Sequence, residues 1–346
     1  MAASTGKAVR QAAKDADPAK VAVAAAGAAA VAAGAAVGVK AAGAKGGGAL
    51  RSPRAFRLKP DEALPDGLRA VALGRIDHAL DMLDGPGVDD VDFAVHEARK
   101  DLKKLRALVR LARGELGNDV YRAENAAFRD AGRRLSGVRD SQVLVETLDE
   151  LKKGLPRGSA TALRRELVKR RRALEAEAGG REDSAREVVS MLEAARARVE
   201  EWPLETDGFE ALEPGLRRIY RDGRRRLAAA EKKPTDENLH EWRKRVKDFW
   251  HHHQLLEFTW PELMEPAAEQ AHHLADLLGD DHDLAVLDAA VGEYAAPEAQ
   301  PVLHEAIATR RSELQARALY LGSRLYDESP RAFSRRVAGW FESARA

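Results

Sequence analysis

Apolar residues recur at helical spacing along most of the chain. In residues 95–113, "VHEARKDLKKLRALVRLAR", they lie three or four residues apart, at Ala98, Leu102, Leu105, Val109 and Ala112. This spacing places them on one face of an α-helix, the face that packs inward. Strand-like alternation of apolar and polar residues is rare, and Pro and Gly fall mostly between the periodic segments. We therefore expect an all-α protein.

Start and stop signals predict six helices in each half of the chain after residue 58. Thr235 is placed to act as an N-cap, Thr259 with Glu262 fits a capping box, and Pro residues stand near several helix starts. Short connections between helices favour antiparallel neighbours and therefore up-and-down bundles. The predicted helices span residues 67–84, 90–113, 117–136, 140–153, 159–178, 183–201, 211–230, 236–257, 261–279, 281–291, 297–323 and 329–344.

An internal repeat at a spacing of about 144 residues relates the two halves. The stretch "HEARKDLKKLRALVRL" at residue 96 aligns with "HEWRKRVKDFWHHHQL" at residue 240. Further on, "LSGVRDSQVL" at residue 135 aligns with "LLGDDHDLAVL" at residue 277. Such self-similarity indicates a duplicated structural unit. We expect one domain, residues 59–346, made of two homologous helical bundles, residues 59–206 and 207–346.

Residues 1–58 differ from the rest because Ala, Gly and Val supply most of the sequence. We expect a low-complexity tail that is disordered or partly helical. Within it, residues 21–39, "VAVAAAGAAAVAAGAAVGV", are uncharged and long enough to span a bilayer. They lack Leu, Ile and Phe, which favour insertion by ~0.3 to 0.6 kcal/mol each. A membrane anchor is therefore the less favoured alternative.

The overall charge and the absence of cysteine exclude several classes of site. The 346-residue chain has no Cys, which rules out disulfides, thiolate metal sites and cysteine nucleophiles and fits a reducing cytoplasm. With 57 Lys and Arg against 56 Asp and Glu, the net charge is +1. A globally basic nucleic-acid binder is therefore not indicated.

A row of cationic residues follows the neighbouring face of the helix predicted at 90–113. Like charges one turn apart, about 5 Å, repel by ~0.8 kcal/mol in bulk water and several times more near a low-dielectric surface. A solvated face neutralised by nearby acids would explain one such row, but not its return in the second half. We infer that both rows face a common polyanion along ~25 Å of helix, a length that suits a linear chain of phosphates. The first row consists of His96, Arg99, Lys103, Arg106, Arg110 and Arg113, and the second row, at the matching positions of the repeat, consists of His240, Arg243 and Lys247.

The order of the motifs adds a resemblance to a known family. "H-E-x-R-K-x-x-K" occurs twice, each copy is followed by "R-D-x-x-V-L" or "H-D-x-x-V-L", and the chain closes with "YLGSRLYDESPRAFSRRVAGWF". This combination resembles the CHAD family, the conserved histidine α-helical domain, over about residues 60–346. The resemblance implies two four-helix-bundle-like halves about a pseudo-twofold axis, a basic central groove, and binding of inorganic polyphosphate, often at storage granules.

The candidate binding residues come from three sources. The resemblance implies phosphate contacts from His96, Arg99, Lys100, Lys103, His240, Arg243, Lys244 and Lys247. The basic row and the second motif add Arg106, Arg110 and Arg139, and a separate basic face at helical spacing adds Arg217, Arg221 and Arg224. In the second half, Trp250, Gln254 and His282 replace Arg106, Arg110 and Arg139, so we expect that side to be weaker or more pH-dependent.

A metal-dependent phosphohydrolase is an alternative, built on the His and Asp cluster at residues 272–283. His273, Asp276, Asp280 and Asp283 follow 3,4,3 spacing, and imidazole with carboxylates is a ligand set for a divalent cation. The matching first-half stretch lacks the histidines. We therefore expect Asp283 to cap or pair at a helix start, and His272 and His273 to lie on a solvated or lightly packed face. The three histidines at 251–253 point about 100° apart and cannot all bind one metal.

A nucleic-acid binder is the other alternative. Single-strand binders interleave aromatic residues with cations, and here only Trp250 does so. We predict a non-catalytic protein that binds inorganic polyphosphate, without a metal or cofactor, in the cytoplasm or at polyphosphate granules. The sequence makes no prediction of the oligomeric state.

Overall fold

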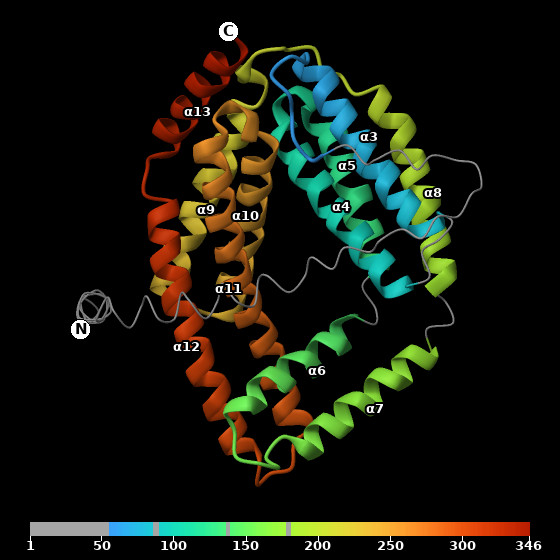
Figure 1. Cartoon of the computed structure of the whole chain (residues 1–346), viewed down its shortest axis with the longest axis vertical. Coiled ribbons are helices and arrows are strands. Elements are labelled where there is room, and N and C mark those ends of the chain that lie inside the picture. Colours follow the sequence, from blue (N-terminus) through green and yellow to red (C-terminus); the bar gives the residue numbers. More distant parts are fainter. Residues whose placement is uncertain (1–54, 86–89, 136–138, 178–180) are drawn as a thin grey trace. The chain divides into compact units, whose positions relative to one another are not determined.

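The computed structural model describes residues 55–85, 90–135, 139–177 and 181–346, without the side chains of residues 139–140, 175–177 and 181–183. Within these residues all regular secondary structure is helical (Figure 1), which confirms the all-α prediction. The predicted tail lies outside the described residues except for residues 55–58. Phe56 and Leu58 are buried, and the Leu58 N–H donates to the carbonyl of Leu255, so this short stretch already belongs to the core.

Four helices of the first half pack as a closed ring: α3 (Leu64–Asp84), α4 (Val91–Leu111), α5 (Arg113–Arg134) and α8 (Arg181–Glu200). The apolar face predicted for α4 points into this ring, and its members from Ala98 to Ala112 are at most 2% exposed. Asp90 caps the start of α4, where its carboxylate accepts from the N–H of Phe93 at 3.0 Å. Burial of one apolar face therefore fixes which face of α4 remains for polar residues.

The second half forms a similar ring from α9 (Glu213–Lys232), α10 (Asp236–Leu255), α11 (Pro261–Tyr294) and α12 (Gln300–Leu325), and α13 (Pro330–Arg345) packs on α9. Thr235 caps α10 as predicted, because its hydroxyl accepts from the N–H of Asn238 at 3.3 Å. The prediction of a capping box formed by Thr259 and Glu262 is wrong. Trp260 occupies the N-cap position of α11, and the Thr259 hydroxyl donates to the carbonyl of Leu256 at 2.8 Å.

The predicted break between residues 279 and 281 is also wrong, since α11 runs through it as one helix of 34 residues. Leu277 and Leu278 before the predicted break and Leu284 and Leu287 after it are all buried, so one apolar face continues across it. The packing of this face on α10 and α12 outweighs the weak helix propensity of the Gly-Asp-Asp segment.

The helices α6 (Arg139–Leu151) and α7 (Thr161–Glu177) lie beside α11 of the second half rather than in the first ring (Figure 1). The guanidinium of Arg170 on α7 lies 3.7 Å from the ring centre of Tyr294, at the end of α11. The first half of the chain therefore supplies two helices that cover the second.

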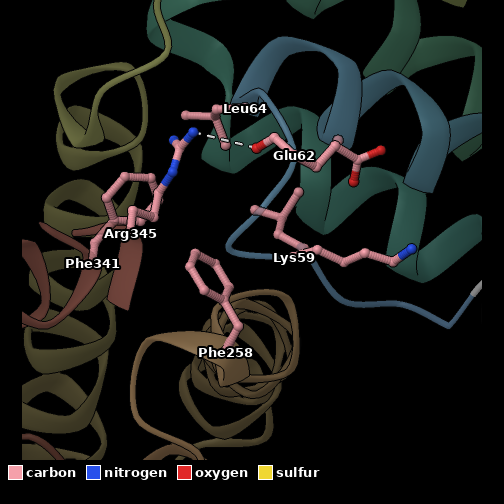
Figure 2. Close-up of a pocket in the computed structure, with 8 residues that line it drawn as sticks. Lys59, Glu62, Leu64, Phe258, Phe341 and Arg345 are labelled. Atoms are coloured by element: carbon pink, nitrogen blue, oxygen red, sulfur yellow. Dashed lines mark hydrogen bonds between the residues drawn. The ribbon is translucent and has the colours of Figure 1, made fainter. Parts of the chain in front are cut away.

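The two rings contact each other through α4, which packs on α10 and α9, and through α5, which packs on α9. The imidazole Nε2 of His252 lies 3.0 Å from the carbonyl oxygen of Ala107, across the α4–α10 contact. At the chain ends, Figure 2 shows Arg345 reaching the backbone of Glu62 beside Phe258 and Phe341, and Arg345 Nη2 donates to the Glu62 carbonyl at 3.3 Å. The side chains around this contact leave about 0 Å³ of free volume, so it is a packing contact without room for a ligand.

The internal repeat remains a prediction from the sequence. Among the described residues, no helix has the length and apolar character needed to cross a bilayer. Residues 21–39 lie outside that part of the chain.

Candidate anion-binding groove

One groove with a volume of about 920 Å³ lies between α4 and α10 and is flanked by α5, α6 and α11. Both basic rows predicted from the sequence line it, so they face a shared space rather than opposite sides of the protein. The exception is Arg113 at the end of the first row, which donates to Asn118 Oδ1 at 2.8 Å instead. The predicted residues in this lining are His96, Arg99, Lys103, Arg106, Arg110, His240, Arg243, Lys244 and Lys247.

Five predicted residues do not belong to the described lining. Lys100 pairs with Glu97 on its own helix at 2.9 Å, and the side chain of Arg139 lies outside the described residues. On α9, Arg217 pairs with Glu213 at 3.2 Å, Arg221 lies 3.9 Å from Asp222, and Arg224 donates to the carbonyl of Glu328. The basic face of α9 therefore has carboxylate and carbonyl partners away from the groove.

The groove also contains three arginines that the sequence analysis missed. Arg129 and Arg133 come from α5, and Arg245 comes from α10, two residues after Arg243. The i, i+4 spacing of Arg129 and Arg133, just before the "R-D-x-x-V-L" motif, was a usable signal because it places both on one helix face. Arg245 does not follow the three- or four-residue spacing of the second basic row, so the sequence offers no comparable signal for it.

The lining carries a strong excess of positive charge. Among the described residues it has ten Lys or Arg and three Asp, a formal excess of seven positive charges. The apolar side chains between them are Leu102, Phe128, Val143, Leu144 and Val286. Low-dielectric walls around like charges strengthen the potential that attracts an anion.

A buried carboxylate links the two basic rows. Asp248 of α10 is 4% exposed, its Oδ1 accepts from Arg110 Nη1 of α4 at 2.7 Å, and its Oδ2 lies 3.1 Å from Arg245 Nη1. Burial disfavours the ionised form of Asp248, but Arg110 and Arg245 outweigh burial and hold its pKa below the usual range. Asp248 therefore connects the two rings as an ion.

Burial, together with repulsion from neighbouring cations, disfavours the charged form of two cations in the groove. Burial, with smaller contributions from the charges of Arg243 and of Arg99 in the opposite row, lowers the pKa of Lys247 to about 8. Burial, followed by Arg110, lowers the pKa of Arg106 to about 10. An anion in the groove would relieve this repulsion, because it favours the charged form of both side chains.

The sequence of residues 70–292 matches the family model described as the CHAD domain. The chain belongs to the CHAD-domain family. It is also similar in fold to the crystal structure of the CHAD domain from the plant Ricinus communis, with 17% sequence identity, a TM-score of 0.51, and coverage of 76% of this chain and 89% of that chain. No curated protein matches the sequence.

In this CHAD domain, a histidine of the second H-E-x-R-K-x-x-K motif lies against a second histidine, with the two rings tilted by 36°. The ring centres of His240 on α10 and His282 on α11 lie 4.5 Å apart, and both rings line the groove. Burial lowers the pKa of His240 to about 4, with smaller contributions from His282, Lys244 and Arg243. His240 is therefore neutral near pH 7, and an anion beside it would favour its charged form.

The His and Asp cluster of α11 does not gather around one point. Asp276 and Asp283 line the CHAD groove, whereas His272 and His273 are exposed, as expected. Among the described residues, no group of three or more His, Asp or Glu side chains is placed to hold a metal ion. The prediction that Asp283 caps or pairs at a helix start is wrong, because the residue lies in the interior of α11.

The three consecutive histidines of α10 belong to the interior. His251, His252 and His253 are all buried, and burial lowers their pKa values to about 3, 4 and 4. Each has a ring nitrogen near an oxygen acceptor, at Gln254, Ala107 and Phe249 respectively. Of these neutral imidazoles, His252 packs in the α4–α10 contact, His253 packs against Phe249 and Phe333, and His251 lines the groove.

Proposed function

We propose that the groove binds inorganic polyphosphate and that the protein does not hydrolyse it. The observation that carries the proposal is the shared lining of the two basic rows, with seven positive charges in excess among the described residues. Arg side chains offer paired N–H donors to phosphate oxygens, and Lys side chains add mobile point charges. A linear phosphate polymer matches this groove, because its lining follows two neighbouring helices and is strongly cationic.

The proposal is tested by competition at equal phosphate concentration. Fluorescently labelled long-chain polyphosphate is bound to the full chain, and single-stranded RNA or single-stranded DNA is added as competitor. We expect unlabelled polyphosphate to displace the probe and the nucleic acids to do so poorly, because the described lining carries no row of aromatic side chains for base stacking. Displacement by RNA or DNA as efficient as by polyphosphate would contradict the proposal.

The absence of catalysis is tested separately. Polyphosphate is incubated with the protein and with Mg²⁺ or Mn²⁺, and its chain length is followed on gels. We expect no shortening. Hydrolysis that is abolished by Asp280→Ala would establish the phosphohydrolase alternative instead. Burial and the neighbouring Asp276 and Asp283 raise the pKa of Asp280 to about 6, so the assay is run on both sides of that pH.

A further inference from the structure

Gly279 of α11 lies directly against the guanidinium of Arg243. A Cβ atom at Gly279 would stand 2.9 Å from Arg243 Nη2 and 3.4 Å from both Cζ and Nε. Three guanidinium atoms lie this close to one point, so the charged group packs against the bare backbone of Gly279. Any larger residue at this position would occupy the space that the guanidinium now fills.

The orientation of Arg243 depends on this contact. Its Nε atom is buried and has no hydrogen-bond partner among the described residues, so no hydrogen bond at Nε sets the plane of the group. Arg243 lies one helical turn from His240 and one from Lys247, and all three line the groove. The charge of Arg243 also contributes to the lowered pKa of Lys247. Where the guanidinium lies therefore affects the centre of the second basic row.

We propose that Gly279 is a positioning residue of the polyanion site. Because glycine has no side chain, the guanidinium of Arg243 can pack against its backbone and is thereby held in the groove. This inference rests on the proposed function. It also accounts for a glycine in the middle of a continuous 34-residue helix, where alanine would be the more stable residue.

Other tightly packed glycines differ from Gly279 in what they contact. A Cβ at Gly322 would stand 2.4 Å from Trp242 Cζ2, and one at Gly223 would stand 2.5 Å from Tyr326 Cε1. Both neighbours are buried rings, so those glycines serve core packing. At Gly279 the neighbour is the far end of a flexible side chain, which can move without disturbing the helices. Gly279→Ala should therefore displace Arg243 and keep the fold.

The experiment compares Gly279→Ala with Gly292→Ala, a matched control on α11 whose Cβ would meet nothing within 4 Å. The melting temperature and the affinity for long-chain polyphosphate are measured for both. We expect neither variant to melt below the wild type. Gly279→Ala should bind polyphosphate about ten-fold more weakly, as for one lost charge-assisted hydrogen bond, and Gly292→Ala should bind normally.

Combination with Arg243→Gln separates positioning from a general effect on the groove. If Gly279 acts only through Arg243, adding Gly279→Ala to Arg243→Gln lowers the affinity no further. Additive losses, or normal affinity of the Gly279→Ala single variant, would overturn the inference while leaving polyphosphate binding by the wild type intact.

A readout without ligand makes the outcome independent of the proposed function. The Nε–H resonance of Arg243, assigned through Arg243→Lys, is followed by ¹H–¹⁵N NMR. We expect slow exchange with water in the wild type and in Gly292→Ala, and a shifted or rapidly exchanging signal in Gly279→Ala. An unchanged signal would refute the positioning role. Failure of the wild type to bind polyphosphate would refute the proposed function, and the spectra alone would then decide whether Gly279 holds Arg243.

Discussion

Replacement of Asp248 by Asn should move stability and polyphosphate affinity in opposite directions. The carboxylate is 4% exposed and joins Arg110 of one ring to Arg245 of the other at 2.7 and 3.1 Å. Asp248→Asn removes its charge and keeps its shape. The fold then loses a buried link between α4 and α10, while the groove loses one of the negative charges that oppose a polyanion.

The size of both effects follows from the geometry. Removal of one partner of a buried ion pair costs about 3 to 5 kcal/mol, and we expect about 3 because Asn still accepts a hydrogen bond. For a domain of this size, that loss lowers the melting temperature by roughly 6 to 12 °C. Removal of one negative charge at ~10 Å from a phosphate makes the free energy of polyphosphate binding more favourable by about 0.4 to 1.7 kcal/mol, for effective dielectric constants of about 80 to 20. The affinity should therefore rise roughly two- to fifteen-fold.

Thermal unfolding and polyphosphate binding at low salt measure the two effects, and Asp276→Asn is the matched control. Asp276 lines the same groove, but its side chain is 59% exposed and its ion-pair partner His272 is 48% exposed. Asp276→Asn should therefore raise the affinity without lowering the melting temperature. An unchanged melting temperature in Asp248→Asn, or weaker polyphosphate binding by that variant while it is still folded, would refute the reasoning.

The pH dependence gives Asp248→Asn a further signature. The pKa of Asp248 is lowered in the folded state, so its contribution to stability is fully present above the unfolded pKa of about 4. That contribution disappears as the pH falls through the folded pKa. The difference in melting temperature between the wild type and Asp248→Asn should therefore narrow in acid below about pH 4, and a constant difference would contradict the assignment.

Two pH windows for binding follow from the lowered pKa values of the groove. A bound polyanion raises the pKa of Lys247 above about 8, so the affinity for polyphosphate should fall as the pH rises through 8, by up to about ten-fold per pH unit. Lys247→Arg should remove that fall. Equal affinity of the wild type at pH values of about 7 and 9 would refute this role of Lys247. A polyanion likewise raises the pKa of His240 above about 4, so the affinity should increase as the pH drops from about 6 towards 4, and His240→Gln should flatten this increase. Calorimetry in buffers of different ionisation enthalpy counts the protons taken up, and no proton uptake in either window would rule out this coupling.

The sequence predicted the helices well because each one buries an apolar face. The face of α4 at Ala98, Leu102 and Leu105 is fully buried, and the spacing of these residues alone identifies it. The basic rows were predictable for the same reason, since helical periodicity places His96, Arg99 and Lys103 on one face. What periodicity leaves open is the element that each face meets.

The break assigned within α11 shows where local signals fail. Gly279, Asp280 and Asp281 together have low helix propensity and are typical of a helix end. In the structure Asp281 is buried and accepts hydrogen bonds from Arg311 Nε at 3.0 Å and Gln315 Nε2 at 2.8 Å, both from α12. These partners lie 30 and 34 residues further along the chain, so the sequence around residue 281 does not reveal them.

The same limit applies to the site. Arg110 and Asp248 are 138 residues apart, and nothing near either residue indicates that they pair. Arg129 and Arg133 join the groove because α5 packs beside α4, which the motifs do not encode. The expectation for Arg217, Arg221 and Arg224 relied on spacing alone, and their partners on α9 and nearby segments place them elsewhere.

The central claim is that one polyanion lies between the two basic rows, and a salt titration of polyphosphate binding near pH 7 tests it most directly. The wild type is compared with Lys103→Glu/Lys247→Glu, one reversal in each row, and with Arg217→Glu/Arg221→Glu, the same charge change away from the groove. Each neutralised phosphate should add about 0.7 to the slope of log K against log salt, by analogy with single-stranded nucleic acids.

We predict a steep slope of log K against log salt for the wild type and for Arg217→Glu/Arg221→Glu. For Lys103→Glu/Lys247→Glu we predict a shallower slope and, at low salt, at least a hundred-fold loss of affinity. A wild-type slope near zero, or unchanged affinity of Lys103→Glu/Lys247→Glu, would contradict the account.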